Sequence, residues 1–419
     1  MGPVTKAAAN ARLPRVALVL GFACLIAVRI PTLWPHGRLW AEEGVVYLAS
    51  AWVDPWYRAL VTIHTGYLNL PASAATTLAV HVVPLEFVPL VTILVALLLQ
   101  VAPACLLAVS DIRWLGDWRM LALALLIIAV PPYSEEVWLN TITSQFHIML
   151  ALAVILAAMP GPGWVAWLQG LVLLFAPLCG PGGVMLFPLF VLRAWLDRSP
   201  RRLIQVLLLL PGVLVQAGVI LTHPEPARTV GTQLSLVLTA ITGKQILLPL
   251  LGQTDASVLA QRLYARFVAG TVPVLAVLAP LAVFGGLGWA AWHTRNAETR
   301  WLFGACMVLM VVSYFGALAP DGPALLILVG GGNRYYFAPA ALTGLVLLGV
   351  AATGRGMIRY TAMGMVAWLL AVGVASYPHV EAWMRHGPDW RAEVAEWRAD
   401  PARPIAIWPD GWSLRLRGQ

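Results

Sequence analysis

The feature that most constrains this chain is a set of long, unbroken apolar runs. Two clear examples are Val88–Val109 and residues 203–221, which contain no charged side chain. A helix needs about 20 such residues to cross the hydrocarbon core of a bilayer. Only helices or closed barrels satisfy their backbone groups there, and barrel strands alternate apolar and polar residues. The continuous runs therefore predict membrane-spanning helices.

The composition of the 419 residues agrees, since 60% are hydrophobic, 11% are charged and the mean hydropathy is +0.79. Soluble proteins carry roughly 25% charged residues. We expect an all-α membrane protein, a polytopic bundle of roughly eleven transmembrane helices with interfacial helices in its exterior loops. The expected spans are residues 14–33, 86–109, 119–133, 146–160, 163–179, 182–196, 202–222, 267–291, 300–319, 335–353 and 358–377.

The topology depends on residues 68–83, a short apolar stretch that also holds Asn69 and His81. We interpret it as an interfacial or re-entrant helix, because the cluster from Arg198 to Arg202 then falls on the cytoplasmic side, as the positive-inside rule requires. The N-terminus is then cytoplasmic and the C-terminus exterior. We expect a transmembrane domain, residues 1–377, and a short exterior tail, residues 378–419. The other expected exterior segments are residues 34–85, 134–145, 223–266 and 320–334.

The first exterior loop begins with two adjacent acids, Glu42 and Glu43, close to the end of the first span. Carboxylates so near hydrocarbon are costly and tend to be paired or functional. A positioned carboxylate can act as general base toward a hydroxyl group or hold a cation. We therefore expect Glu42 and Glu43 to form the catalytic pair, one taking the proton and the other orienting. The alternative is a pair of solvated acids near Arg38.

Two further residues of this loop, His64 and Tyr67, flank a turn at Gly66. His64 is suited to donate to a phosphate or to orient a carboxylate, although a lone interfacial histidine is more often structural. We assign His64 to phosphate binding and Tyr67 to sugar binding.

The second exterior loop crowds acid, indole and amide groups before a span begins, at Glu136, Trp138, Asn140 and Gln145. Such groups suit hydrogen bonds to sugar hydroxyls and stacking on sugar faces. We assign all four to acceptor or sugar binding. The alternative is a helix start with ordinary caps and an aromatic residue at the membrane interface.

Two cations complete the candidate site, Lys244 and Arg334. Arg334 follows three glycines that allow the backbone close to a ligand, and a guanidinium there can clamp a phosphate. We assign both cations to phosphate binding, and the neighbouring Tyr335 to sugar binding. The alternatives are attraction to lipid headgroups for Lys244 and snorkelling for Arg334.

The bulk features add exclusions. The net charge of +8 is explained by cytoplasmic arginines and by basic residues near lipid or phosphate, so no nucleic-acid partner is expected. The four cysteines lack metal-ligand spacing. In the tail, Trp390, Val394 and Trp397 share one helical face. No metal site and no cofactor are assigned, although the acids are compatible with a divalent metal.

Together these parts resemble the GT-C superfamily of membrane glycosyltransferases. The resemblance rests on the acids Glu42 and Glu43 after the first span, on interfacial helices in that loop, and on the element Arg334-Tyr335-Tyr336-Phe337-Ala338-Pro339 that opens a late span. It implies that Glu42 or Glu43 is the general base, that Arg334 binds the donor phosphate, and that the donor is a sugar on a polyprenyl phosphate. The chain departs from better-known members in its Glu-Glu pair and in lacking a large soluble C-terminal domain.

The resemblance implies transfer to a glycan, lipid or protein acceptor of the cell envelope, with membrane lipids around the protein. The composition favours a bacterial protein, so the expected location is the bacterial inner membrane. Three rival interpretations are a transporter or flippase of a lipid-linked sugar, a non-catalytic subunit of an envelope-assembly complex, and a polymerase of lipid-linked oligosaccharides. Transporters tend to carry ionisable residues within their spans and to show repeat symmetry. The expected spans of this chain are almost free of charge and show no repeat, which disfavours a transporter.

Overall fold

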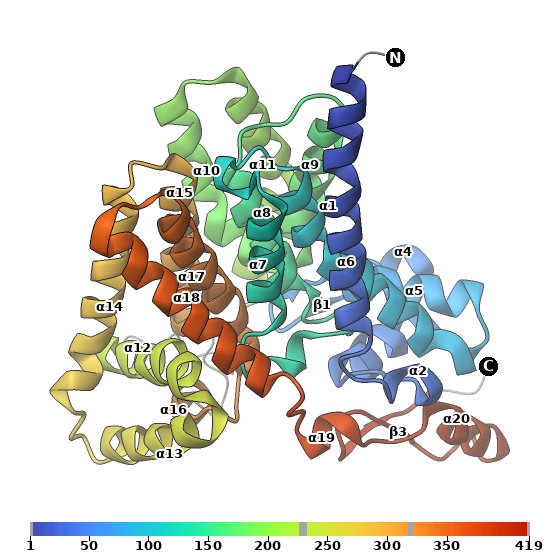
Figure 1. The fold of residues 1–419 in the computed structure, drawn as a ribbon. Coiled ribbons are helices and arrows are strands. Elements are labelled where there is room, and N and C mark those ends of the chain that lie inside the picture. The colour runs from blue at the N-terminus through green and yellow to red at the C-terminus, as the bar shows by residue number, and fades with distance from the viewer. Residues whose placement is uncertain (1–2, 226–232, 317–321, 417–419) are drawn as a thin grey trace.

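The structure, a computed structural model, describes residues 3–225, 233–316 and 322–416, and it is almost entirely helical (Figure 1). The longest helices are α1 (Pro3–Ala27), α6 (Val88–Val109), α11 (Pro200–Thr222), α13 (Leu248–Val268), α14 (Val274–His293), α15 (Ala297–Gly316), α17 (Asn333–Thr353) and α18 (Gly356–Ser376). Shorter helices in the bundle are α7 (Trp118–Ala129), α8 (Ser144–Ala157), α9 (Trp164–Phe175) and α10 (Gly182–Asp197).

Short elements fill the connections between these helices. The α-helical ones are α2 (Leu33–His36), α3 (Ala49–Val53), α4 (Trp56–Ala59), α5 (Leu70–Val82), α12 (Leu234–Ile241), α16 (Gly322–Ile327), α19 (Ala382–Arg385) and α20 (Trp390–Ala399). Two segments have π-helical geometry, η1 (Glu43–Leu48) and η6 (Thr242–Leu247). The tighter turns are η2 (Leu85–Phe87), η3 (Arg113–Leu115), η4 (Glu135–Val137) and η5 (Ala176–Cys179). Two antiparallel hairpins pair β1 (Ile63–His64) with β2 (Tyr67–Leu68) and β3 (Ile405–Ile407) with β4 (Trp412–Leu414).

Within the described residues, seven helices are long and apolar enough to cross a membrane. They are Leu85–Val109, Pro200–Thr222, Leu234–Val268, Val274–His293, Ala297–Phe315, Asn333–Thr353 and Gly356–Ser376. This confirms the expected helical membrane protein. Several other expected spans fall on shorter apolar helices, such as Trp118–Ala129 and Ser144–Ala157. The total of eleven spans stays a prediction.

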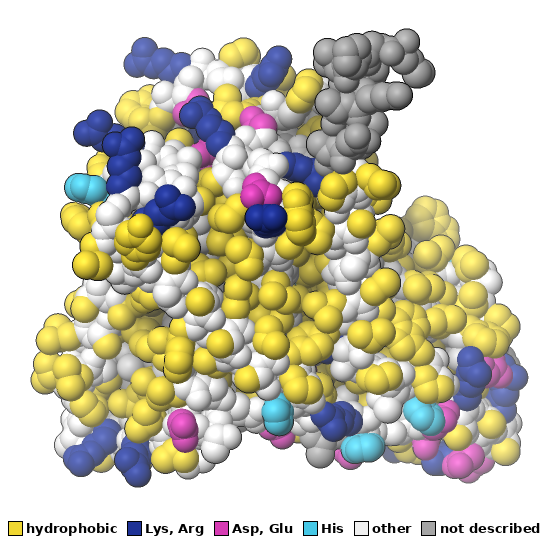
Figure 2. Space-filling model, viewed as in Figure 1, with side chains coloured by type: hydrophobic (Ala, Val, Ile, Leu, Met, Phe, Trp, Pro, Cys, Tyr) yellow, Lys and Arg dark blue, Asp and Glu magenta, His cyan; other side chains and the backbone are white. Residues whose placement is uncertain are grey.

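The outer surface carries the side chains that a lipid environment favours. Leu203, Leu207 and Leu214 on α11 are each more than half exposed, as is Trp368 on α18. Figure 2 shows a broad hydrophobic band with charged side chains mainly at the two ends of the molecule, one of which is the end where α1 begins. The opposite end carries residues 378–416 (Figure 1) and is called the tail end below.

One of the seven apolar helices, Leu234–Val268, lies in a segment that we expected to be exterior. It comprises α12, η6 and α13, and it is interrupted at Gly252, whose φ of 74° is not helical. Figure 1 shows α12 and α13 running across the upright helices at the tail end. The composition and length of Leu234–Val268 therefore match a membrane span, but the segment does not run as one straight helix through the bundle.

Helix α5, which covers most of the stretch 68–83, has 13 residues. At about 1.5 Å per residue it is far shorter than the roughly 30 Å hydrocarbon core. It packs along α6 and η1 at the tail end. Its length agrees with the expected non-spanning helix, and its relation to a membrane stays a prediction.

The tail packs on the loop that follows α1. In α20 the side chains of Trp390, Val394 and Trp397 are buried together, which confirms the shared face expected for them. Asp389 caps this helix by accepting hydrogen bonds from the backbone N–H groups of the next turn. The backbone N–H of Trp408 donates to the carbonyl of Leu39 at 3.1 Å, so the tail and the first loop share a short parallel bridge.

Candidate functional site

Two cavities meet at the tail end of the bundle. The first, called the bundle cavity, has a volume of about 370 Å³ and lies between the first loop and side chains of α8, α10 and α15. The second, called the tail cavity, has a volume of about 260 Å³ and is partly walled by Glu381, Trp383 and Trp412. The two cavities share four lining residues, which are Trp40, Glu42, Glu136 and Arg334. This shared boundary contains three of the residues that the sequence marked.

Glu42 and Glu43 occupy different environments although they are adjacent. Glu42 is half-buried and lines both cavities. Among the described residues it makes no side-chain hydrogen bond or ion pair, so its carboxylate is available to a ligand. This geometry favours Glu42 over Glu43 as the group that contacts a substrate.

Glu43 is completely buried and fully engaged. Its carboxylate accepts hydrogen bonds from the backbone N–H of Trp40 at 3.1 Å, from the backbone N–H of Thr141 at 3.0 Å and from the Thr141 hydroxyl. Burial raises the pKa of Glu43, and these hydrogen bonds and the nearby Arg38 oppose the shift. Glu43 therefore joins the first loop to the second and orients its neighbour.

Arg38 also joins the first loop to the second loop. It is 1% exposed and donates to the carbonyl groups of Trp138 and Leu139 at 2.7 and 3.3 Å. Its guanidinium also lies over the rings of Trp40 and Trp408. Burial lowers the pKa of Arg38 to about 10, which leaves it charged at neutral pH. The sequence suggested Arg38 as a mere neighbour of solvated acids, and the structure makes it a buried crosslink.

The backbone beside Glu42 is strained and is held by the tail. Ala41 has a φ of 43°, in the left-handed region that side chains other than glycine seldom adopt. Its N–H donates to the carbonyl of Trp408 at 2.5 Å. In the second loop Tyr133 and Leu139 also have positive φ angles, of 59° and 57°. Strained residues persist where their surroundings fix them, and they cluster at functional sites.

Arg334 stands at the boundary of the two cavities and pairs with Glu136. Gly332 precedes it with a φ of 57°, which allows the chain to turn into α17. The guanidinium also lies 5.1 Å from the centre of the Tyr335 ring. Arg334 is 34% exposed in its side chain, so a ligand can reach it. The structure thus brings together Glu42, Glu136 and Arg334 from three distant parts of the chain.

Lys244 does not line either cavity, contrary to its assignment as a phosphate ligand. It is completely buried, and its ammonium group donates to the carbonyl of Leu325 at 2.9 Å and to that of Gly331. These bonds join the end of α16, through Leu325, to the glycine turn that leads into Arg334, through Gly331. Lys244 is therefore placed to support this turn rather than to contact a ligand.

The remaining expected ligand residues divide into two groups. His64, Tyr67, Gln145 and Tyr335 line the bundle cavity. The Gln145 amide donates to the Tyr67 hydroxyl at 3.4 Å, and the His64 ring packs edge-on against Tyr47. These four assignments are compatible with ligand contact.

Trp138 and Asn140, by contrast, are internal and line neither cavity. Trp138 packs between Phe22, His147 and Phe337 in the core. Asn140 accepts from the N–H and hydroxyl of Thr143, so it shapes the loop as an ordinary cap does. Here the structural alternative describes the residues better than sugar binding.

Several residues that the sequence analysis missed hold the site. Gln100, inside the apolar α6, donates to the carbonyls of Val137 and Asn140 and accepts from the N–H of Leu139 at 2.9 Å. A lone amide within an apolar run was the available signal. Thr141 and the tail residues Trp383 and Trp412 carried no comparable signal, because their roles depend on contacts distant in sequence.

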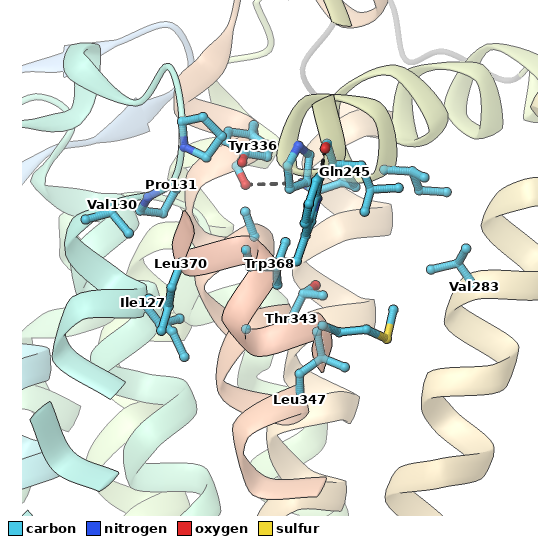
Figure 3. Close-up of a pocket in the computed structure, with 18 of the residues that line it drawn as sticks. Ile127, Val130, Pro131, Gln245, Val283, Tyr336, Thr343, Leu347, Trp368 and Leu370 are labelled. Carbon is cyan, nitrogen blue, oxygen red and sulfur yellow. Dashed lines mark hydrogen bonds between the residues drawn. The ribbon is translucent and has the colours of Figure 1, made fainter. Parts of the chain in front are cut away.

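A third cavity, an apolar groove of about 390 Å³, lies between α14, α17, α18 and η6 (Figure 3) and shares no lining residue with the other two. Its walls include Val283, Leu347 and Trp368, and its polar edge is formed by Gln245 and Tyr336. The Gln245 amide donates to the backbone carbonyl of Tyr336 at 3.1 Å. Such a groove suits a hydrocarbon chain.

Within the described ranges no group of three or more His, Cys, Asp or Glu side chains could hold a metal ion. The acids of the tail cavity are therefore not arranged as a ready-made metal site. Comparisons with known protein-family models, with curated proteins and with solved structures found no match for this chain.

Proposed function

We propose that this protein is a membrane glycosyltransferase that moves a sugar from a polyprenyl-phosphate donor to an envelope acceptor at the exterior face. The observation that carries the proposal is the shared boundary of the two cavities, where Glu42, a carboxylate with no hydrogen bond or ion pair among the described residues, lies with the guanidinium of Arg334. Glycosyl transfer needs a base for the acceptor and a cation for the leaving phosphate.

The donor phosphate is assigned to the start of α17. Arg334 lies in the first turn of this 21-residue helix, where the backbone N–H groups also favour an anion. Tyr336 and Ala340 of the same helix line the apolar groove. A phosphate at Arg334 is thus connected by one helix to a groove that suits a polyprenyl chain.

In the proposed reaction Glu42 takes the proton of an acceptor hydroxyl. The hydroxyl oxygen then forms a bond to the anomeric carbon of the donor sugar. The bond between that carbon and the phosphate oxygen breaks, and the electron pair leaves with the phosphate. Arg334 releases Glu136 in part and stabilises the charge that develops on the phosphate. A single displacement of this kind inverts the anomeric carbon.

The proposed topology places the tail end outside the cytoplasm and the N-terminus inside. It includes about eleven crossings, with α5 and the α12–α13 segment along the membrane surface. The cluster from Arg198 to Arg202, at the turn between α10 and α11, lies at the opposite end of the bundle (Figure 1), and this supports the orientation through the positive-inside rule. The expected membrane is the bacterial inner membrane.

A transfer assay with polyprenyl-phosphate sugars tests the proposal on purified variants. Glu42→Gln removes the base and is expected to lower kcat about 100-fold or more. Arg334→Ala is expected to lower kcat by a similar factor, because the leaving group loses its cation. Glu43→Gln is the matched control, since this carboxylate faces neither cavity, and it should retain more activity than Glu42→Gln. Equal turnover in wild type, Glu42→Gln and Arg334→Ala would refute the proposal.

A further inference from the structure

The tail cavity combines indole rings with hydrogen-bonding groups. Trp383 and Trp412 come from the tail, and both are more than one-third exposed. Trp40 comes from the first loop and packs against Trp383 with ring centres 5.7 Å apart. Large, partly exposed aromatic rings beside polar groups are suited to the apolar faces and polar edges of a sugar ring.

Two of the residues that line this cavity carry a buried oxygen that accepts no hydrogen bond among the described residues. Oδ1 of Asn333 and Oε1 of Glu135 make no hydrogen bond among the described residues, although the two residues are only 5% and 3% exposed. Arg29 forms a buried ion pair with the Glu135 oxygen at 3.6 Å, so Oδ1 of Asn333 is the acceptor left without a partner among the described residues. A buried acceptor without a donor is costly, so a ligand hydroxyl or ammonium group would stabilise this site by donating to Asn333.

The charge of the lining selects among such ligands. Four carboxylates line the tail cavity, on Glu42, Glu135, Glu136 and Glu381. Among its described lining residues the single cation is Arg334, which is paired with Glu136, and Glu135 is paired with Arg29, which does not line the cavity. A ligand carboxylate placed here would still meet Glu42 and Glu381, which form no ion pair among the described residues, whereas a hydroxyl or an ammonium group would meet no like charge from them.

We infer that the tail cavity is a sugar-binding subsite that accepts a neutral or amino sugar ring and rejects a negatively charged one. The inference rests on the proposed function and deepens it by naming the sugar class. The ring is either the sugar carried by the donor or the terminal sugar of the acceptor. In both cases the tail supplies the recognition surface and Glu42 lies at its inner boundary.

Binding is tested on the purified full chain without any donor, by saturation-transfer NMR with three methyl glycosides, those of glucose, glucosamine and glucuronic acid. The glucoside and glucosaminide should bind, and the glucuronide should bind about tenfold more weakly or not at all. Trp412→Ala should weaken binding of the glucoside about fivefold. Trp56→Ala, an exposed indole in α4 outside both cavities, is the matched control and should bind as wild type does.

Glu381→Gln removes one carboxylate from the cavity, so the affinity for the glucuronide should move closer to the affinity for the glucoside. Equal binding of all three glycosides, no binding of any, or unchanged binding by Trp412→Ala would overturn the inference. Sugar binding without transfer would support the subsite and count against the proposed transferase. Transfer without sugar binding would support the transferase and count against the subsite. The KM values of Trp412→Ala for donor and for acceptor identify which substrate supplies the ring, because only the KM of that substrate should rise. Unchanged KM values for both substrates would also overturn the inference.

Discussion

Glu42 and Glu43 show how far the environment of a side chain outweighs its sequence position. Their pairing after the first span was predictable from the sequence, as was their functional interest. The different environments of the two carboxylates were not predictable, because Glu43 accepts hydrogen bonds from Thr141, which lies in the next loop. The same reason explains Lys244, whose partners Leu325 and Gly331 lie far along the chain.

The raised pKa of Glu43 predicts a pH-dependent stability. Because burial raises the pKa in the folded state above its ordinary value of 4.5, the folded chain holds this proton at pH values where the unfolded chain has lost it. Stability contributed by Glu43 is therefore lost as pH rises from about 4.5 through the folded pKa. Thermal unfolding of wild type and Glu43→Gln between pH 5 and 8 measures this loss.

The expected result is a melting temperature that falls more steeply with pH in wild type than in Glu43→Gln. Other titrating groups are common to both proteins, so the difference between the two curves isolates this carboxyl. Parallel curves would contradict the burial that the structure assigns to Glu43.

At the scale of elements, the tail is the piece that sequence analysis described locally and could not place. The shared face of Trp390, Val394 and Trp397 followed from helical spacing. The bridge between Trp408 and Leu39 did not, because pairing between short strands far apart in sequence leaves no periodic signal. That bridge fixes the backbone beside Glu42, so the tail is predicted to control the site at a distance.

Gly387 offers a way to disturb the tail alone. A Cβ atom at this position would lie 2.3 Å from Cε2 of Trp408, so the buried indole must move. Gly387→Ala is expected to destabilise the docked tail by about 1–3 kcal/mol through overpacking. Amide hydrogen exchange at Ala41, whose N–H donates to Trp408, should accelerate, and transfer activity should fall.

Gly285→Ala is the control, because a Cβ atom there meets no atom within 4 Å. It should leave exchange at Ala41 unchanged. Unchanged exchange in Gly387→Ala as well would show that the tail does not hold the first loop.

At the scale of the whole molecule, the helical membrane class was predictable because hydropathy alone requires it. The path of individual segments through the bundle was less predictable from the sequence. Leu234–Val268 has the length and hydropathy of a span, yet the glycine at 252 interrupts it and its halves run across the bundle in Figure 1. Hydropathy averages over a window and cannot register a single backbone angle.

Cysteine labelling tests the proposed orientation in a background without the four native cysteines. Arg113→Cys and Ala395→Cys introduce thiols at exposed positions at opposite ends of the molecule. An impermeant maleimide should label residue 395 in intact spheroplasts, and residue 113 only after permeabilisation. Labelling of both from the same side would refute the arrangement on which the exterior site depends.

The bridge between Leu39 and Trp408 also has a consequence for biogenesis. The ribosome produces residues 39–43 long before residues 405–408, and the two segments must meet before Ala41 takes its final conformation. The carboxylate of Glu42 thus gains its setting only after every intervening helix has been inserted. A chain synthesised only as far as α18 would therefore lack the final conformation of Ala41, and the proposed transfer reaction could begin only after the tail has docked.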